Sequence, residues 1–285
     1  MLAVGVNHLE SKQVAGSYIF RAASRNKANL IVLDAAQNPF GFNASTWLKP
    51  TKGKEELAIN ALAKAVMAKL SASSAAKVKE SAASLGAINI TQATKEAGLD
   101  VEDLNNAAAM LAKSKHSVVI YGKDILRVKN SKLVTSLFRL ASISRKQNPK
   151  KPRVISLKPK GNSRGAWDLG LANTKEFSLS NLTKNGMKAV YMLLADDYVD
   201  DSKIVNSLKR AKFVVVQASY SSSVTTMANV VLPSPTWAER KGSYTSLDGI
   251  TRSTPKLIQP AKNIKPDEDI IKGISKRIKI SDRRS

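Results

Sequence analysis

Short apolar runs separated by amphipathic stretches restrict the folds that this chain can adopt. Near the amino terminus, the run Leu2–Val6 is followed by a helical pattern over Val14–Arg25 and by a β-branched run, Leu30–Leu33. Two strands joined by a helical crossover pair in parallel, because the crossover returns the chain to the same end of the sheet. The pattern therefore predicts a βαβ unit and an α/β fold.

The same alternation continues along the chain. A stripe of apolar residues at helical spacing predicts a helix over Glu55–Leu70. The later expected elements are helix Val101–Lys113, strand Ser117–Tyr121, helix Ser131–Ile143, strand Val154–Leu157, strand Ala189–Leu194, helix Ser202–Lys209 and strand Phe213–Gln217. A length of 285 residues suggests about two domains. We predict two doubly wound, mostly parallel-sheet domains, residues 1–88 and 89–260, and a basic carboxyl-terminal tail, residues 261–285.

The residues available as metal ligands limit the chemistry of the chain. It contains no cysteine, and iron-sulfur clusters are normally held by cysteine thiolates, so a cluster site built wholly from this chain is not expected. Its two histidines, His8 and His116, are far apart in sequence and show no metal-ligand spacing. No apolar run is long enough for a membrane span, and no signal peptide is recognisable, so we expect a cytoplasmic protein.

The net charge suggests the kind of partner. The chain has 46 Lys and Arg against 22 Asp and Glu, a formal charge of +24. Such a field attracts nucleic acid, anionic lipid or acidic protein. The basic residues are spread along the chain, however, and no zinc-finger, helix-turn-helix or RNP pattern accompanies them. We favour a generally basic surface that meets an acidic protein or a membrane-associated surface over dedicated nucleic-acid binding.

Several candidate residues follow predicted strands. The turn Gly5–Asn7 leads towards a helix amino terminus, where free N–H groups and the macrodipole hold phosphate, although the G-x-G-x-x-G fingerprint is absent. Asp34 ends the next strand and either reads a ribose or base edge or caps its own loop. The paired Asp196 and Asp197 are expected to cap the following helix rather than to act as acid and base.

The segment Ala228–Arg252 carries a family resemblance. Its Asn229–Pro233, Glu239–Thr245 and Asp248–Arg252 pieces resemble a passage of the molybdopterin oxidoreductase family. Further similar landmarks, in the same order, are Val4–Asn7 with Glu10–Ser11, Asn29–Asp34, Trp47–Pro50 with Gly53–Glu55, Val119–Gly122, Gly161–Gly170 and Ala189–Leu193. The most similar members are the large iron-sulfur subunit of respiratory NADH:quinone oxidoreductase and the catalytic subunit of formate dehydrogenases.

The resemblance implies a site for a molybdopterin guanine dinucleotide, either retained or vestigial. The residues that it assigns to cofactor binding are Gly5, Asn7, Asp34, Gly53, Glu55 and Gly122. It assigns no catalytic residue and no metal ligand. The chain departs from the family where Ala35 and Ala36 replace a Pro-Arg pair. Relative to the family, both domains are expected to lack their opening segments.

Three functions are compatible with these features. The favoured hypothesis is a structural, assembly or electron-transfer subunit of a respiratory complex of the NADH dehydrogenase type. Such a subunit would lack its own iron-sulfur clusters, retain no cofactor and catalyse nothing alone. Its partners would be other subunits, including a cysteine-bearing iron-sulfur chain, at the inner face of a membrane. The alternatives are the carboxyl part of a split molybdopterin enzyme, such as formate dehydrogenase, and a nucleic-acid-binding protein.

Overall fold

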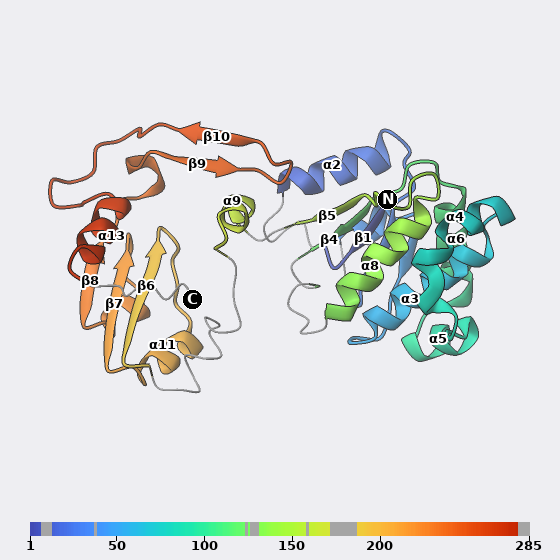
Figure 1. Cartoon of the computed structure of the whole chain (residues 1–285), viewed down its shortest axis with the longest axis horizontal. Helices are drawn as coiled ribbons and strands as arrows, with labels where there is room; N and C mark the ends of the chain where they lie inside the picture. Colours follow the sequence, from blue (N-terminus) through green and yellow to red (C-terminus); the bar gives the residue numbers. More distant parts are fainter. Residues whose placement is uncertain are drawn as a thin grey trace. The chain divides into compact units, whose positions relative to one another are not determined.

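The protein consists of two compact units, each built on its own parallel sheet (Figure 1). The computed structural model describes residues 1–6, 13–36, 39–122, 125, 131–157, 160–171 and 187–278. The units are Met1–Gly161 and Asn162–Ser285. The α/β class with parallel sheets, predicted from the alternation of elements, is confirmed.

The boundary expected at residues 88–89 lies inside the first unit. Strand β4 (Val119–Tyr121) pairs with β1 (Leu2–Val4), so residues on both sides of that boundary share one sheet. The helices between them pack on the same core. The division between compact units lies instead between Gly161 and Asn162.

The sheet of the first unit has the strand order β3-β2-β1-β4-β5, and every pair of neighbours is parallel. The remaining strands are β2 (Ile31–Leu33), β3 (Thr46–Leu48) and β5 (Val154–Ser156). The chain builds outward from β1 to β3 and then returns to the other side of β1. This reversal between β1 and β4 is a topological switch point, where open α/β sheets bind ligands at the carboxyl ends of their strands.

Helices bury one face of this sheet. The helices of the unit are α2 (Gln13–Ser24), α3 (Glu55–Ala68), α4 (Ala72–Ala82), α5 (Ile90–Ala97), α6 (Val101–Lys113) and α8 (Ser131–Ser144), with short 3-10 turns η1 (Pro39–Asn43) and η2 (Ala83–Leu85). Helix α3 packs against α5, α6 and α8. Its alanines at positions 58, 61, 63 and 65 are buried and allow these helices to approach closely. Alternate strand residues, such as Leu2 and Val4, face the same core.

Side-chain caps fix where several of these helices begin. The Asp100 carboxylate accepts the backbone N–H groups of Glu102 at 2.7 Å and Asp103 at 3.0 Å, so α6 starts where the sequence predicts. Ser71 caps α4 in the same way. The Ser- and Ala-rich stretch that follows Ser71 is therefore a helix.

The second unit contains a three-stranded parallel sheet in the order β6-β7-β8 among its described residues. Its strands are β6 (Ala189–Ala195), β7 (Phe213–Ala218) and β8 (Val230–Pro233). Its other elements are α9 (Ser163–Asp168), α11 (Ser202–Leu208), α12 (Ser223–Thr226), η3 (Trp237–Glu239), α13 (Asp267–Ser275) and an antiparallel hairpin of β9 (Gly242–Thr245) and β10 (Thr251–Thr254). Leu208, Val214, Val216 and Val224 form a small core on one face of the sheet.

The segment predicted as a basic tail, residues 261–285, contains a folded helix. Helix α13 has three acidic residues in its first turn, at positions 267, 268 and 269. Acidic side chains there complement the helix dipole. The prediction of a basic tail rested on the net charge of residues 261–285. It therefore missed the acidic residues that lie together at the start of the helix.

The cap of α6 provides a stability test. Because Asp100 satisfies two otherwise unpaired N–H groups, Asp100→Ala is expected to lower the free energy of unfolding of the first unit by about 1 kcal/mol. Asp100→Asn is the matched control, since asparagine caps helices almost equally well. Chemical denaturation followed by circular dichroism measures both variants; equal losses from the two variants would contradict the cap assignment.

Candidate functional site

Five of the six cofactor-site candidates lie at one edge of the first sheet. Gly5, Asp34 and Gly122 directly follow β1, β2 and β4, and Gly53 and Glu55 follow β3 in the loop that begins α3. The carboxyl ends of parallel strands meet at the same edge, so the fold brings these residues together there. The sixth candidate, Asn7, lies outside the described residues, as does His8.

Gly5 and Gly122 form a close backbone contact at the switch point. A Cβ atom on Gly122 would lie 2.1 Å from the carbonyl oxygen of Gly5. Gly5 has a φ of +55°, and a Cβ there would meet Ile125 at 2.9 Å. The Gly5 N–H donates to the Leu33 carbonyl at 3.2 Å, and the Gly122 N–H donates to the Val4 carbonyl at 3.1 Å. Both glycines therefore serve the packing of β1 against β4.

Asp34 stabilises its own loop. Its carboxylate accepts the backbone N–H of Ala36 at 3.0 Å, which is the loop-cap arrangement considered from the sequence. The indole N–H of Trp47 donates to the Asp34 carbonyl at 3.3 Å. The Lys49 ammonium lies 4.2 Å from the centroid of the Trp47 ring, a cation–π contact. Lys49 thus places positive charge near Asp34 at the same edge.

The loop after β3 is also internally bonded. The Glu55 carboxylate accepts the N–H of Gly53 at 3.0 Å, and Gly53 has a φ of +86°. Glu55 and Glu56 occupy the first turn of α3, where their charges already compensate the helix dipole. A phosphate group at this helix start would meet two carboxylates.

These contacts allow a test of whether the described residues suit a dinucleotide. Phosphate cradles depend on unbonded backbone N–H groups that point at the ligand. The N–H groups of Gly5, Gly53 and Gly122 are all bonded within the chain. Within the described part of this edge, the N–H groups of these three glycines are therefore not available to a phosphate.

A polar network occupies the carboxyl edge of the second sheet. Arg240 donates to Asp196, after β6, at 2.5 Å and to Asp267, at the start of α13, at 2.9 Å. Asp267 also accepts the Gln217 side-chain N–H at 2.6 Å and the Ser234 hydroxyl. The three charged side chains are each less than one-third exposed. The network ties α13 to the ends of the strands.

The network corrects the prediction for Asp196 and Asp197. Helix α11 is capped by Asp201, whose carboxylate accepts the Lys203 N–H at 2.8 Å. Asp196 instead pairs with Arg240, which is 44 residues further along the chain. The sequence reasoning missed Arg240, Asp267 and Gln217. The available signal was a polar residue, Gln217, at the end of an apolar run, since a buried amide needs a partner.

Tyr191 completes the network. Its hydroxyl donates to the Gln217 side-chain oxygen. Burial raises the pKa of Tyr191 above its ordinary value, and the negative charge of Asp267 raises it further.

No group of three or more His, Asp or Glu side chains gathers as a metal site in the part of the chain that the structure describes. The arrangement is suited to joining elements rather than to holding a metal.

The Ala228–Arg252 segment is stabilised by its own acidic residues. The Glu239 carboxylate accepts hydrogen bonds from the backbone N–H of Thr236 at 2.8 Å and from the Thr236 hydroxyl at 2.9 Å. These two bonds hold the turn of η3. Asp248 accepts the Ser246 hydroxyl and the Ile250 N–H in the turn between β9 and β10. These hydrogen bonds lower the pKa of Asp248, and the bond from Ser246 has the larger effect. These acids define the loop geometry.

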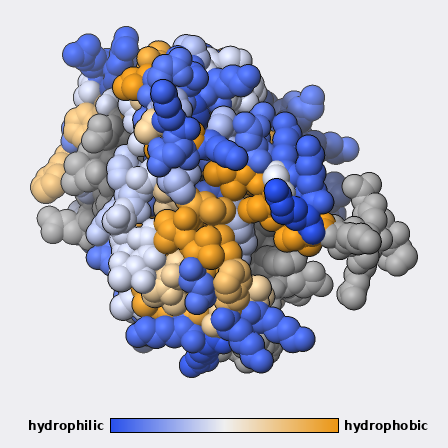
Figure 2. Space-filling view, turned by 90° about the vertical axis from the view of Figure 1, so that its left-hand side faces the viewer, coloured by the Kyte–Doolittle hydropathy of each residue, from blue (hydrophilic) through white to orange (hydrophobic). Residues whose placement is uncertain are grey.

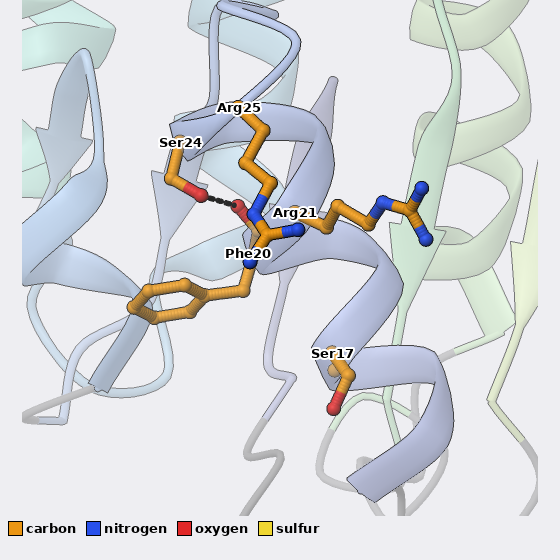
Figure 3. A pocket seen from close by; sticks show the side chains of 6 residues that line it. Ser17, Phe20, Arg21, Ser24 and Arg25 are labelled. Atoms are coloured by element: carbon orange, nitrogen blue, oxygen red, sulfur yellow. Dashed lines mark hydrogen bonds between the residues drawn. The ribbon is translucent and has the colours of Figure 1, made fainter.

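A shallow cavity of about 430 Å³ runs along α2 (Figure 3). It is lined by Ser17, Phe20, Ser24 and two arginines, Arg21 and Arg25. The Ser24 hydroxyl donates to the Phe20 carbonyl at 2.8 Å, as the dashed line shows. Both arginines are exposed, so they place positive charge at the cavity.

Comparison with known proteins identifies the family. Residues 1–277 match the family described as Molybdopterin oxidoreductase. The chain belongs to the molybdopterin oxidoreductase family. This confirms the resemblance found in the sequence. The solved structure of acetylene hydratase from Pelobacter acetylenicus has a similar fold, with a TM-score of 0.70 and 15% identity over 97% of this chain and 47% of that one.

Curated members of the molybdopterin oxidoreductase family are similar at low identity. NADPH-Fe(3+) oxidoreductase subunit alpha of Geobacter sulfurreducens is 25% identical over 91% of this chain and 35% of its own length. NADH-ubiquinone oxidoreductase 75 kDa subunit of Reclinomonas americana is 27% identical over 66% of this chain and 28% of its own length. The chain therefore spans about a third of the length of these relatives.

The glycine contact at the switch point gives the second prediction. Gly122→Ala places a methyl group against the Gly5 carbonyl, so we expect a loss of about 2–3 kcal/mol of unfolding free energy through overpacking. Gly161→Ala is the control, because no atom lies within 4 Å of its Cβ position. Denaturant titration measures both; a wild-type midpoint for Gly122→Ala would refute the contact.

The Tyr191 network gives the third prediction. Asp267→Asn removes a negative charge, so the pKa of Tyr191 should fall towards its ordinary value of 10.0 while staying above it, since burial remains. Titration of tyrosinate absorbance, with Tyr191→Phe subtracted, measures the shift. A folded-state pKa above the unfolded value stabilises the fold below pH 10.0, and this contribution is lost as pH rises through the folded pKa. An unchanged or higher pKa in Asp267→Asn would exclude the coupling.

Proposed function

We propose that the protein is a structural or assembly subunit of a respiratory oxidoreductase complex of the NADH:quinone oxidoreductase type. In this role it carries no iron-sulfur cluster of its own and does not catalyse a reaction alone. The observation that carries the proposal is an apolar face on the sheet of the second unit that the described residues of that unit leave partly uncovered, called the uncovered face below. The class of complex is proposed from a relative that is named as a NADH-ubiquinone oxidoreductase subunit.

The uncovered face lies opposite the small core of the second unit. Tyr191, Leu193 and Phe213 are 41%, 47% and 45% exposed, and register places them on the side of the sheet away from Val214 and Val216. Parallel sheets are normally covered on both faces. On the side of the molecule that Figure 2 shows, apolar residues also gather in a patch among hydrophilic ones. A second protein layer over Tyr191, Leu193 and Phe213 would complete the sheet.

The names of the relatives are consistent with such a layer being another subunit. The matched proteins of Geobacter sulfurreducens and Reclinomonas americana are both named as subunits. Because this chain contains no cysteine, clusters in its complex would be held by another, cysteine-bearing chain. We further propose that the complex lies at the inner face of a membrane. No helix in the described ranges is long and apolar enough to cross one.

We also propose that the subunit retains no molybdopterin cofactor. The bonded N–H groups of Gly5, Gly53 and Gly122 support a subunit that retains no pterin dinucleotide. The alternative is the carboxyl part of a split molybdopterin enzyme. It is favoured by a 22% identical match over 99% of this chain to F420-dependent formate dehydrogenase subunit alpha of Methanocaldococcus jannaschii. Metal analysis of the native complex separates the two, since molybdenum or tungsten in a 1:1 ratio to the chain would support the alternative.

The proposal predicts that the uncovered face holds partners. Leu193→Glu should leave the isolated protein folded, because Leu193 is 47% exposed, but should reduce co-purification of electron-transfer subunits about tenfold. Leu169→Glu is the matched control, since Leu169 is 78% exposed and lies outside the sheet. Quantitative mass spectrometry of the affinity-purified native protein measures retention. Wild-type protein that retains no electron-transfer subunit would overturn the proposal.

A further inference from the structure

The amino edge of the first sheet contains a cavity of about 590 Å³. It is lined by Met1 before β1, by Lys27–Asn29 and Ile31 at the start of β2, by residues of α6, and by Ser114 and His116 before β4. Its volume falls within the range of ligand sites in proteins. It lies at the edge opposite Gly5, Asp34 and Gly122, so it is separate from the family site.

The rim of this cavity carries uncompensated positive charge. Lys27 and Lys113 are exposed on it beside the imidazole of His116, and no acidic residue lines it. Within the described ranges, none of these three side chains forms an ion pair. Lys115 is a near neighbour in sequence, and Lys146 donates to the carbonyl of Ala112 in the last turn of α6. The amino edge therefore presents a cluster of cations.

Acidic residues at strand ends and helix starts of the same unit lie at the other edge. Asp34 follows β2, Glu55 begins α3 and Asp100 caps α6. This placement leaves the cations of the amino edge without nearby carboxylates from those elements. These cations would attract an anionic partner. At short range, salt screens the attraction between the opposite charges least.

The floor of the cavity is apolar. Ile31 and Leu111 are buried beneath it, and Ala109 and Met110 line it from α6. No Phe, Tyr or Trp side chain lines the cavity, so it lacks the large stacking surface with which proteins hold single-stranded nucleic acid. An apolar floor under a cationic rim instead suits a peptide segment that presents an apolar side chain flanked by carboxylates.

Lys27 adopts a backbone conformation that lysine disfavours. Its φ is +51°, and the Ala28 N–H bonds to the Ala22 carbonyl at 3.0 Å, which makes Lys27 the left-handed residue that ends α2. Glycine is the usual residue at such a position. A strained residue at a cavity rim points to a role for its side chain.

We propose that the amino-edge cavity of the first unit binds an acidic segment of a partner protein. One apolar side chain of the segment sits on the floor formed by Ala109 and Met110, and its carboxylates contact Lys27 and Lys113. The proposal is independent of the uncovered face of the second sheet and of the cofactor state of the chain.

Binding of synthetic peptides to the full chain, followed by fluorescence anisotropy at 0.15 M salt, tests this proposal. The probe is a labelled peptide of glutamates with spaced leucines; in the control peptide, serines replace the leucines. We expect Lys113→Ala to weaken binding of the leucine peptide about threefold to fivefold, as loss of an exposed charge pair does. Lys52→Ala, at the opposite edge, removes the same charge and should have no effect.

Two further variants separate binding from folding. Lys27→Gly should weaken binding by a similar factor while raising the melting temperature by about 2 °C, because glycine relieves the left-handed conformation. Ala109→Phe should fill the floor and abolish the preference for the leucine peptide without changing charge. Ala76→Phe, on the exposed side of α4, is its control.

Several outcomes would overturn the proposal. Equal losses from Lys113→Ala and Lys52→Ala would mean attraction by general surface charge. Equal affinity for the leucine and serine peptides would remove the role of the floor. Binding of an oligo-dA strand or of phosphatidylserine vesicles, but not of the peptide, with the same sensitivity to Lys113→Ala would assign the edge to a different class of partner.

Discussion

The pairing of β1 with β4 is the constraint on which the first unit depends. It joins the first fifty residues to a strand that begins at Val119, and it can form only if the backbones at Gly5 and Gly122 come close enough to exclude any side chain. The same pairing sets the switch point and gathers the loops of the carboxyl edge. Among the described residues of this edge, the backbone N–H groups of Gly5, Gly53 and Gly122 are therefore all bonded within the chain.

Much of the local structure could be predicted from the sequence because its causes are local. The β-branched runs became strands, and Asp100 capped α6 through residues two and three positions away. The domain boundary was missed because it depends on pairing between strands far apart in sequence. The partners of Asp196 and Asp267 were missed for the same reason, since Arg240 reaches them across 44 and 27 residues. Propensity and spacing do not encode such contacts.

Five of the six candidate cofactor residues lie at one edge of the first sheet, and the described contacts of these residues are made within the chain. Asp34 and Glu55 each satisfy a backbone N–H within their own loop. A match to a family motif shows that residues occur in the same order along the chain. Binding a phosphate requires, in addition, backbone N–H groups that are not already bonded within the protein. The sequence shows the order of the motif residues, but only the structure shows which of their N–H groups are bonded.

The Asp267 carboxylate also has a consequence for local unfolding. It accepts hydrogen bonds from β7, from the residue after β8 and from the residue after η3, so three separate segments share one acceptor. Detachment of α13 would leave Gln217 and Ser234 without this acceptor in a partly buried place and leave Arg240 with Asp196 alone, which is costly. The sheet and the terminal helix of the second unit should thus open to solvent as one cooperative foldon, and their amide hydrogens should exchange together.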